Sequence, residues 1–192
     1  MNLYRLLLPW LPATIRAVYR MEIAGAEHVP RSGGVVVVAN HLSAIDPFVL
    51  GAAVPRELHY MAKQELWRSR PLGWTLDGLG GFPVDRGRGD RGAITRAVEL
   101  LEQGEAVGIF PGGRVRWEGP WFRGAAKMAL CAGAPILPVR LFDTDRAVAG
   151  RRVRFPRVRV VVGAPLPVER AKPTIASARE LTERMRTTIE AL

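Results

Sequence analysis

The sequence predicts a single α/β domain in which helices cover a mixed, mainly parallel β-sheet. Three observations predict this fold. Short apolar segments of strand length alternate along the chain with segments whose apolar residues recur at helical spacing. Residues 35–39 form an unbroken run of valines and an alanine, typical of a parallel strand that is buried on both faces. The length of 192 residues suits one domain, and no repeat, low-complexity run or long Gly/Ser linker divides the chain.

Strands are expected where apolar and β-branched residues run between turn residues. The first is an edge strand at residues 23–29, which a Pro- and Gly-containing loop at 30–34 connects to the central strand. The other expected strands, in chain order, are residues 35–39, 58–62, 80–86, 106–110, 136–141 and a β-rich segment at 153–162.

Helices are expected in the segments between these strands. Residues 90–103 repeat apolar side chains at helical spacing and end at Gly104, a typical helix stop. Shorter helices are expected at 48–53 and 124–132, and one or two within 63–80. Thr174 should cap a final helix. The residues expected on the core face of that helix are Ile175, Ala178, Leu181, Met185 and Ile189.

The chain is organised around residues 40–47, which directly follow the central strand. His41 and Asp46 are five residues apart, so they would not meet in a helix and would point to opposite faces of a strand. A turn can bring them together, and the helix would then start with Asp46 as N-cap and Pro47 as first residue. A carboxylate that accepts from one ring nitrogen leaves the other free to take a proton from a hydroxyl. The alternative is that His41 satisfies a backbone group and Asp46 only caps a helix.

The formal net charge is +10, and all but three of the 28 basic side chains are arginines. Such an excess predicts attraction to anions, whether nucleic acid, anionic lipid surfaces or phosphorylated substrates. The sequence has no helix-turn-helix, zinc-ligand or RNA-binding signature, which argues against nucleic acid. Cys131 is the only cysteine, so no internal disulfide is expected and a reducing compartment is favoured. The three histidines have no metal-binding spacing, and no metal is expected.

Residues 1–22 form an apolar N-terminal segment that arginines and prolines interrupt. It is too short and too broken for a spanning helix, and no cleavage site of a signal peptide follows it. Two interpretations stay open. The segment is either an amphipathic element lying in a membrane interface or a helix packed on the core of the domain. The main domain would then comprise residues 23–192.

Two further segments can bind an anion at the edge of the sheet where His41 is expected. Arg86 follows a short strand, and a guanidinium there can bind a phosphate through two hydrogen bonds, although an isolated arginine is usually a solvated surface charge. The loop from Pro111 to Arg116 combines Gly112 and Gly113 with two arginines, which suits close approach of the backbone to an anion. It lacks the Lys-Ser/Thr ending of a nucleotide-binding P-loop.

Four of these segments, taken in order, resemble the motifs of the glycerolipid acyltransferase superfamily, whose best-known members are the lysophosphatidic acid acyltransferases. The first is Asn40-His41-x4-Asp46, with Pro47-Phe48 after it. The others are Gly81-Phe82-Pro83-Val84-Asp85-Arg86, Phe110-Pro111-Gly112-Gly113 and Ala134-Pro135-Ile136-Leu137-Pro138-Val139. Together they cover residues 40–139, and the ordered combination is more specific than any single motif.

The resemblance implies a glycerol-3-phosphate acyltransferase-like fold and an O-acyltransferase of phospholipid biosynthesis. It implies a fatty acyl donor, acyl-CoA or acyl carrier protein, and a lysophospholipid acceptor such as 1-acyl-sn-glycerol-3-phosphate, with no other cofactor. His41 would act as general base and Asp46 would orient it. Arg86, with Arg114 or Arg116, would hold the acceptor phosphate, and backbone amides near Gly112 and Gly113 would stabilise the anion. The enzyme would lie peripherally on the cytoplasmic face of the cell membrane, attracted by its anionic surface.

The third motif departs from the family pattern. Gly112 stands where the family usually has glutamate and Val115 where it has arginine, while Arg114 and Arg116 flank that position. Glu118 or a neighbouring arginine is a candidate substitute. Two alternatives therefore remain: a catalytically altered, lipid-binding relative, and an acyltransferase with a different acceptor.

Overall fold

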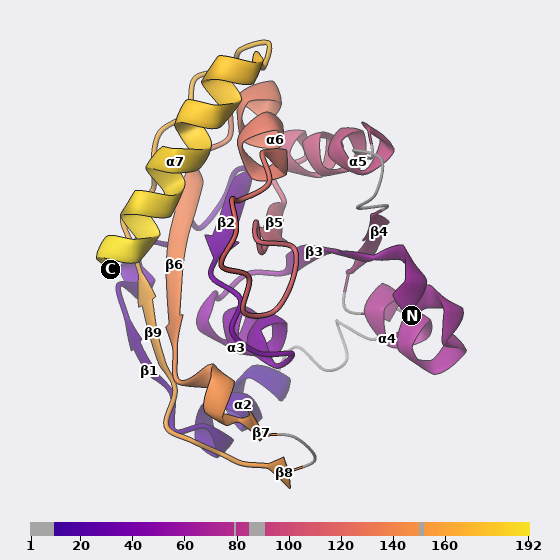
Figure 1. Ribbon diagram of the computed structural model, residues 1–192, viewed down its shortest axis with the longest axis vertical. Helices are drawn as coiled ribbons and strands as arrows, with labels where there is room; N and C mark the ends of the chain where they lie inside the picture. The colour runs from indigo at the N-terminus through magenta and orange to yellow at the C-terminus, as the bar shows by residue number, and fades with distance from the viewer. Residues whose placement is uncertain (1–9, 79, 85–90, 150–151) are drawn as a thin grey trace.

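A computed structural model of the protein describes residues 10–78, 80–84, 91–149 and 152–192 (Figure 1). The described part contains a seven-stranded mixed sheet with strand order β1-β9-β6-β2-β5-β3-β4, as expected for the predicted α/β class. Its strands are β1 (Glu22–Ala24), β2 (Val35–Ala39), β3 (Leu58–Lys63), β4 (Phe82–Val84), β5 (Ala106–Ile109), β6 (Ile136–Phe142) and β9 (Arg159–Val162). All neighbouring pairs run parallel except β6 and β9. A small antiparallel pair, β7 (Val148–Ala149) and β8 (Arg152–Val153), stands apart from the sheet.

Helices lie on both faces of the sheet (Figure 1). The α-helices are α2 (Leu11–Val18), α3 (Asp46–Ala53), α4 (Arg70–Gly78), α5 (Arg91–Glu102), α6 (Gly124–Ala132) and α7 (Ile175–Ala191). The 3-10 helices are η1 (Ala26–His28), η2 (Gln64–Arg68) and η3 (Thr144–Arg146). Helices α5, α6 and α7 pack on one face, and α2 and α3 pack on the other.

Strand β2 is the centre of the fold, and all five of its residues are fully buried. It pairs in parallel with β5 on one side and with β6 on the other. Because side chains alternate along a strand, Val35 and Val37 pack towards α3 while Val36 and Val38 pack towards α6 and α7. The carboxyl ends of β2, β5 and β6 therefore meet at one edge of the sheet, where ligands bind in open α/β folds.

Two predicted strands and one predicted core residue differ notably from the structure. The expected edge strand at 23–29 ends at Ala24, because Gly25 takes a left-handed conformation (φ 75°) that starts η1. The β-rich segment at 153–162 is strand only at its two ends, in β8 and β9. Ile175, expected in the core, is 77% exposed because the first turn of α7 reaches beyond the end of the sheet (Figure 1).

The N-terminal helix α2 packs on the domain. The Arg16 guanidinium donates to the Ala52 carbonyl at 2.7 Å, Tyr19 is buried, and Ile15 contacts the core. Trp10, by contrast, is 75% exposed. The helix therefore contributes to the core with one side and presents apolar surface on another. Within the described ranges, no helix has the length and apolar character needed to cross a membrane.

Removing the cap of α7 should destabilise the fold. Thr174 Oγ1 accepts from the Ser177 amide at 3.0 Å, and Ser177 Oγ accepts from the Thr174 amide at 3.0 Å, which confirms the predicted cap and makes it a capping box. We expect Thr174→Ala to lower the free energy of unfolding by about 1 kcal/mol in urea titration. Thr188→Ala, which removes a hydroxyl bonded within the same helix, is the control. Equal stability of both variants would contradict a capping role.

Candidate active site

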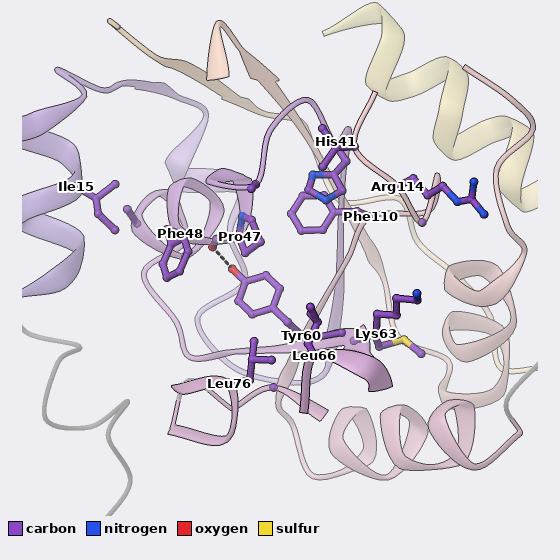
Figure 2. A pocket seen from close by; sticks show the side chains of 18 of the residues that line it. Ile15, His41, Pro47, Phe48, Tyr60, Lys63, Leu66, Leu76, Phe110 and Arg114 are labelled. Atoms are coloured by element: carbon purple, nitrogen blue, oxygen red, sulfur yellow. Dashed lines mark hydrogen bonds between the residues drawn. The ribbon is translucent and has the colours of Figure 1, made fainter. Parts of the chain in front are cut away.

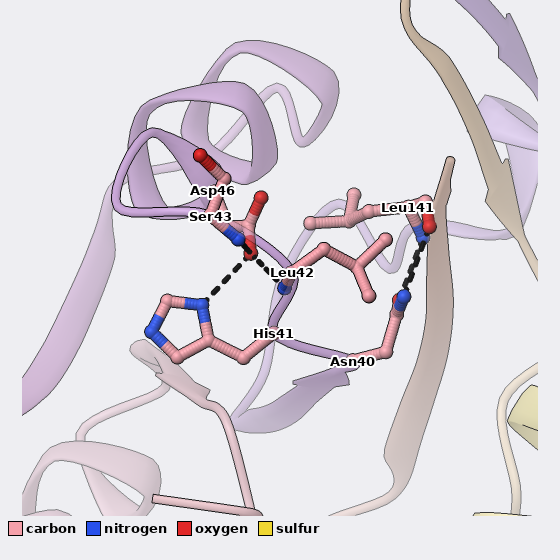
Figure 3. A network of polar contacts seen from close by, with 6 residues as sticks. All are labelled: Asn40, His41, Leu42, Ser43, Asp46 and Leu141. Atoms are coloured by element: carbon pink, nitrogen blue, oxygen red, sulfur yellow. Dashed lines mark hydrogen bonds and ion pairs between the residues drawn. The ribbon is translucent and has the colours of Figure 1, made fainter. Parts of the chain in front are cut away.

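The turn that follows β2 is built around the carboxylate of Asp46, which is fully buried. Its Oδ2 atom accepts from the amides of Leu42 at 2.6 Å and Ser43 at 2.8 Å, and from His41 Nδ1 at 2.8 Å (Figure 3). The predicted pairing of His41 with Asp46 through a turn is therefore confirmed.

The predicted N-cap role of Asp46 is wrong in detail. Ile45 is the N-cap of α3, and Asp46 is its first residue. The carboxylate bonds backwards, to amides three and four residues earlier, and so closes the turn that precedes the helix. These two amides fix its Oδ2 atom within hydrogen-bond distance of the imidazole.

The imidazole of His41 is held on several sides. Because a carboxylate can only accept, the hydrogen of the neutral ring lies on Nδ1, and Nε2 carries the lone pair. The ring stacks on Phe110 with centroids 4.4 Å apart and planes 24° apart. The His41 carbonyl also accepts from the Arg116 amide at 2.7 Å. Within the described residues, no hydrogen-bond partner is found for Nε2, so that atom is available to a ligand.

An apolar cavity of about 540 Å³ opens beside His41 (Figure 2). It lies between α2 and α3 on one side and β3, η2 and α4 on the other. Tyr60 stands in its wall, with its hydroxyl donating to the Pro47 carbonyl at 2.7 Å. Its apolar lining includes Leu11, Ile15, Phe48, Leu66, Leu76 and Phe110. Such a lining suits a long hydrocarbon chain.

A second, more polar cavity of about 330 Å³ lies on the other side of the histidine. Its lining includes Asn40, Gly112, Arg116, Trp117, Glu118 and Asp145. His41 and Arg114 line both cavities. A ligand with an apolar chain in one cavity and a polar end in the other would therefore pass its reacting atoms beside His41.

The loop after β5 places its two arginines differently. Arg114 lies over the ring of Trp117, with Cζ 5.7 Å from the ring centroid. The Arg116 guanidinium donates to the Asp145 carbonyl at 3.0 Å, and its backbone adopts a left-handed φ of 55°. Arg114 therefore faces both cavities, while Arg116 ties the loop to η3 and, through its amide, to His41.

Gly112 is explained by its neighbour Trp117. A Cβ atom at position 112 would lie 3.0 Å from Trp117 Cβ and 3.1 Å from Cδ1, so any side chain there would press on the indole. Trp117 thus occupies the space next to position 112. Glu118, the next residue, lines the same polar cavity.

The predicted site residues that the structure describes converge on this edge of the sheet. His41 and Asp46 are bonded, and Gly112, Gly113, Arg114 and Arg116 each line at least one of the two cavities. The Gly113 amide donates to the Phe110 carbonyl at 2.9 Å, so it closes a turn. Arg86 lies outside the described residues. His59, predicted to be structural, contacts the Gly80 carbonyl at 3.2 Å.

Sequence reasoning did not assign roles to Phe110, Trp117 or Asp145. Phe110 was recognised as part of a motif, but its stacking on His41 depends on the register of β2 and β5. Trp117 lies in the loop after β5 and Asp145 lies in η3, and both line the polar cavity. An aromatic residue at the end of a neighbouring strand was the available signal for Phe110.

The chain is similar to known acyltransferases over most of its length. A family model described as Acyltransferase matches residues 20–141. The chain is 32% identical over 149 residues to a 1-acyl-sn-glycerol-3-phosphate acyltransferase of Bacillus subtilis, covering 76% of this chain and 73% of the relative. It is 33% identical over 175 residues to 1-acyl-sn-glycerol-3-phosphate acyltransferase alpha of Ovis aries, covering 87% of this chain and 60% of the relative.

A solved structure supports the fold. The crystal structure of the 1-acyl-sn-glycerophosphate acyltransferase PlsC from Thermotoga maritima matches with a TM-score of 0.74 at 22% identity, covering 97% of this chain and 80% of that one. The family model spans well over half of the chain and includes both His41 and Asp46. The chain therefore belongs to the acyltransferase family.

Proposed function

We propose that this acyltransferase transfers a fatty acyl group from an acyl thioester, acyl-CoA or acyl carrier protein, to the hydroxyl of a lysophospholipid such as 1-acyl-sn-glycerol-3-phosphate in phospholipid biosynthesis. The observation that carries the proposal is the His41 to Asp46 pair, 2.8 Å between Nδ1 and Oδ2, at the boundary of an apolar and a polar cavity. The names of the relatives at about 30% identity, 1-acyl-sn-glycerol-3-phosphate acyltransferases, support the same acceptor.

In this mechanism His41 acts first as a base and then as an acid. Nε2 takes the proton of the acceptor hydroxyl as the oxygen attacks the thioester carbonyl. The tetrahedral intermediate then expels the thiolate, which receives that proton from Nε2. Asp46 stabilises the imidazolium formed in between, because its carboxylate is buried and bonded to the ring. The reaction needs no cofactor besides the thioester, which is a co-substrate.

The two cavities supply the two kinds of surface that the substrates require. A fatty acyl chain fits the apolar cavity, and the phosphate of a lysophospholipid fits the polar one beside Arg114 and Arg116, with Arg86 as a further candidate. With the Gly113 amide engaged in a turn, the Gly112 amide is the remaining candidate of the two for stabilising the oxyanion. Positioning of both substrates would supply much of the acceleration.

The test is a mass-spectrometric assay of the purified protein. Mixed acyl-CoA and acyl carrier protein donors are offered with a panel of lysolipids on vesicles, including one acceptor without phosphate. A new diacyl phospholipid supports the proposal and identifies the acceptor. Lipid binding without product would support the alternative that the altered loop at Gly112 and Val115 belongs to a lipid-binding relative. A product from the phosphate-free acceptor alone would overturn the proposed acceptor.

Arg114→Ala should weaken acceptor binding. Because Arg114 lines both cavities and lies over Trp117, its loss removes a charged donor from the polar cavity. We expect the acceptor KM to rise by about 10- to 100-fold, the range of one or two charged hydrogen bonds, with little change in kcat. Arg184→Ala, on the exposed side of α7, is the charge-matched control. Equal KM values in both variants would exclude Arg114 from acceptor binding.

Residues 1–22 are proposed to hold the enzyme peripherally on the cytoplasmic face of the cell membrane. Support comes from exposed apolar side chains on elements around the apolar cavity, since Trp10 is 75%, Phe48 42%, Leu66 38% and Trp74 64% exposed. The net charge of +10 favours an anionic surface.

Trp10→Ala should therefore reduce binding to anionic vesicles. Tryptophan suits a membrane interface because its ring is apolar and its N–H can stay hydrated, and at 75% exposure Trp10 contributes little to the core. Co-sedimentation with vesicles that contain phosphatidylglycerol measures the effect. Ile175→Ala, with 77% exposure on α7, is the control and should bind normally. Undiminished binding of the Trp10 variant would argue against an interfacial role for this part of the chain.

A further inference from the structure

Strand β6 continues beyond the end of its neighbour β2. The last paired residues of the two strands are Ala39 and Val139, while β6 runs on to Phe142. At this point β2 must leave the sheet, because the chain turns to present His41 to the two cavities. The next backbone groups of β6 on this side belong to Leu141, which is buried.

The side chain of Asn40 takes the place of the missing strand. Its Oδ1 accepts from the Leu141 amide at 2.7 Å, and its Nδ2 donates to the Leu141 carbonyl at 2.9 Å (Figure 3). The primary amide thus offers an acceptor to the Leu141 N–H and a donor to the Leu141 C=O, in place of the backbone groups of a paired strand. The two residues are 101 positions apart in the chain, so this contact fixes the end of β2 against β6.

The backbone of the catalytic turn is thereby held from both sides. Asn40 anchors it to β6 immediately before His41, and the Arg116 amide holds the His41 carbonyl from the loop after β5 at 2.7 Å. Asp46 fixes the ring itself. Of these contacts, the two hydrogen bonds between Asn40 and Leu141 are the ones that tie the position of His41 to β6 in the sheet.

We infer that Asn40 is a positioning residue for His41: its paired hydrogen bonds to Leu141 hold the imidazole in line with the junction of the two cavities. The inference rests on the proposed role of His41 as the general base. It assigns to Asn40 an effect on the chemical step, because its amide group, which lines the polar cavity, is already engaged by Leu141 rather than offered to a substrate.

Two variants separate this role from a general loss of stability. Asn40→Ala removes both hydrogen bonds. Asn40→Asp keeps the acceptor for the Leu141 amide, but as a carboxylate it faces the Leu141 carbonyl with a second acceptor. Once protonated, the same side chain regains a donor and restores the pair. Arg56→Met is the matched control, because the Arg56 guanidinium donates to the carbonyls of Pro30, Gly33 and Gly104 at the opposite end of β2.

The kinetic readout is kcat and both KM values across a range of pH, each divided by the wild-type value at the same pH. We expect Asn40→Ala to lose about 10²-fold in kcat, the cost of a displacement near 1 Å, with unchanged KM values. The relative kcat of Asn40→Asp should rise as the pH falls, while that of Asn40→Ala stays flat. Dividing each variant's value by the wild-type value cancels the pH dependence that all variants share from the titratable groups around the polar cavity. These groups are His41, Arg114, Arg116, Glu118 and Asp145.

The second readout needs no substrate and therefore separates this inference from the proposed function. In protein labelled with 15N-histidine, the Nδ1 proton of His41 bonded to Asp46 should give a downfield signal, assigned by its absence in His41→Ala. It should shift or broaden in Asn40→Ala and stay in place in Arg56→Met. An unmoved signal with wild-type kcat in Asn40→Ala would overturn the inference, as would equal losses of kcat in Asn40→Ala and Arg56→Met. If the wild type forms no product, the His41 Nδ1 proton signal alone tests whether Asn40 positions His41.

Discussion

Replacing His41 with alanine should lower kcat by about 10²- to 10⁴-fold, the usual contribution of a general base, and leave the fold intact. The side chain is partly exposed at the junction of two cavities, so its loss removes the stacking on Phe110 and the bond to Asp46 but no part of the buried core. Product formation is measured by mass spectrometry, and the melting temperature is measured in parallel.

His59→Ala is the matched control for this variant. His59 lies on β3 and contacts the Gly80 carbonyl, outside the lining of both cavities that meet at His41. It should retain wild-type turnover. If His41→Ala were folded and equally active, the proposed mechanism would be wrong, because no other histidine lines either cavity in the described part of the chain.

Asp46→Asn should lower kcat by about 10²-fold. The amides of Leu42 and Ser43 both point at Oδ2, so the amide oxygen of asparagine should occupy that position and still accept from His41. The ring would keep its hydrogen on Nδ1 but would lose the negative charge that stabilises the imidazolium, worth about 2 to 3 kcal/mol. In a Ser-His-Asp triad the same change costs about 10⁴-fold because the ring takes the wrong tautomer.

The size of the loss in kcat therefore shows whether Asp46 acts through its charge, through the tautomer of His41, or only through the fold. A loss near 10²-fold with a normal acceptor KM supports electrostatic stabilisation with the tautomer retained. Unchanged kcat would show that Asp46 serves the fold alone. Asp77→Asn, at a carboxylate that accepts from Trp67 Nε1 on the protein surface, should leave kcat unchanged. Asp46→Ala is less informative, because it leaves three donors without their acceptor and should destabilise the turn.

Local signals in the sequence predicted the parts of the fold that local physics determines. The valine run of β2 has the length and composition expected of a buried strand, and Thr174 precedes an amphipathic segment that forms α7. The pairing of His41 with Asp46 followed from a spacing of five that only a turn can close. Ile175 was misplaced because helical periodicity gives the direction of a side chain but not where the underlying sheet ends.

The contacts that complete the site depend on sheet register and loop paths, which no short segment encodes. Asn40 meets Leu141 only because β2 and β6 are aligned at Ala39 and Val139. Phe110 reaches His41 because β5 lies on the other side of β2. The motif identifies the pair of His41 and Asp46, and these long-range contacts fix where the pair lies in the site.

The contact between position 112 and Trp117 has an evolutionary consequence. A lineage that carries glutamate at 112 would meet steric conflict on acquiring this tryptophan, and the present protein would meet the same conflict on regaining glutamate, since a Cβ at 112 already comes within 3.0 Å of Trp117. The two positions should therefore change together among relatives, with glycine accompanying the bulky ring. Introducing glutamate at 112 into this scaffold is therefore expected to need a smaller residue at 117.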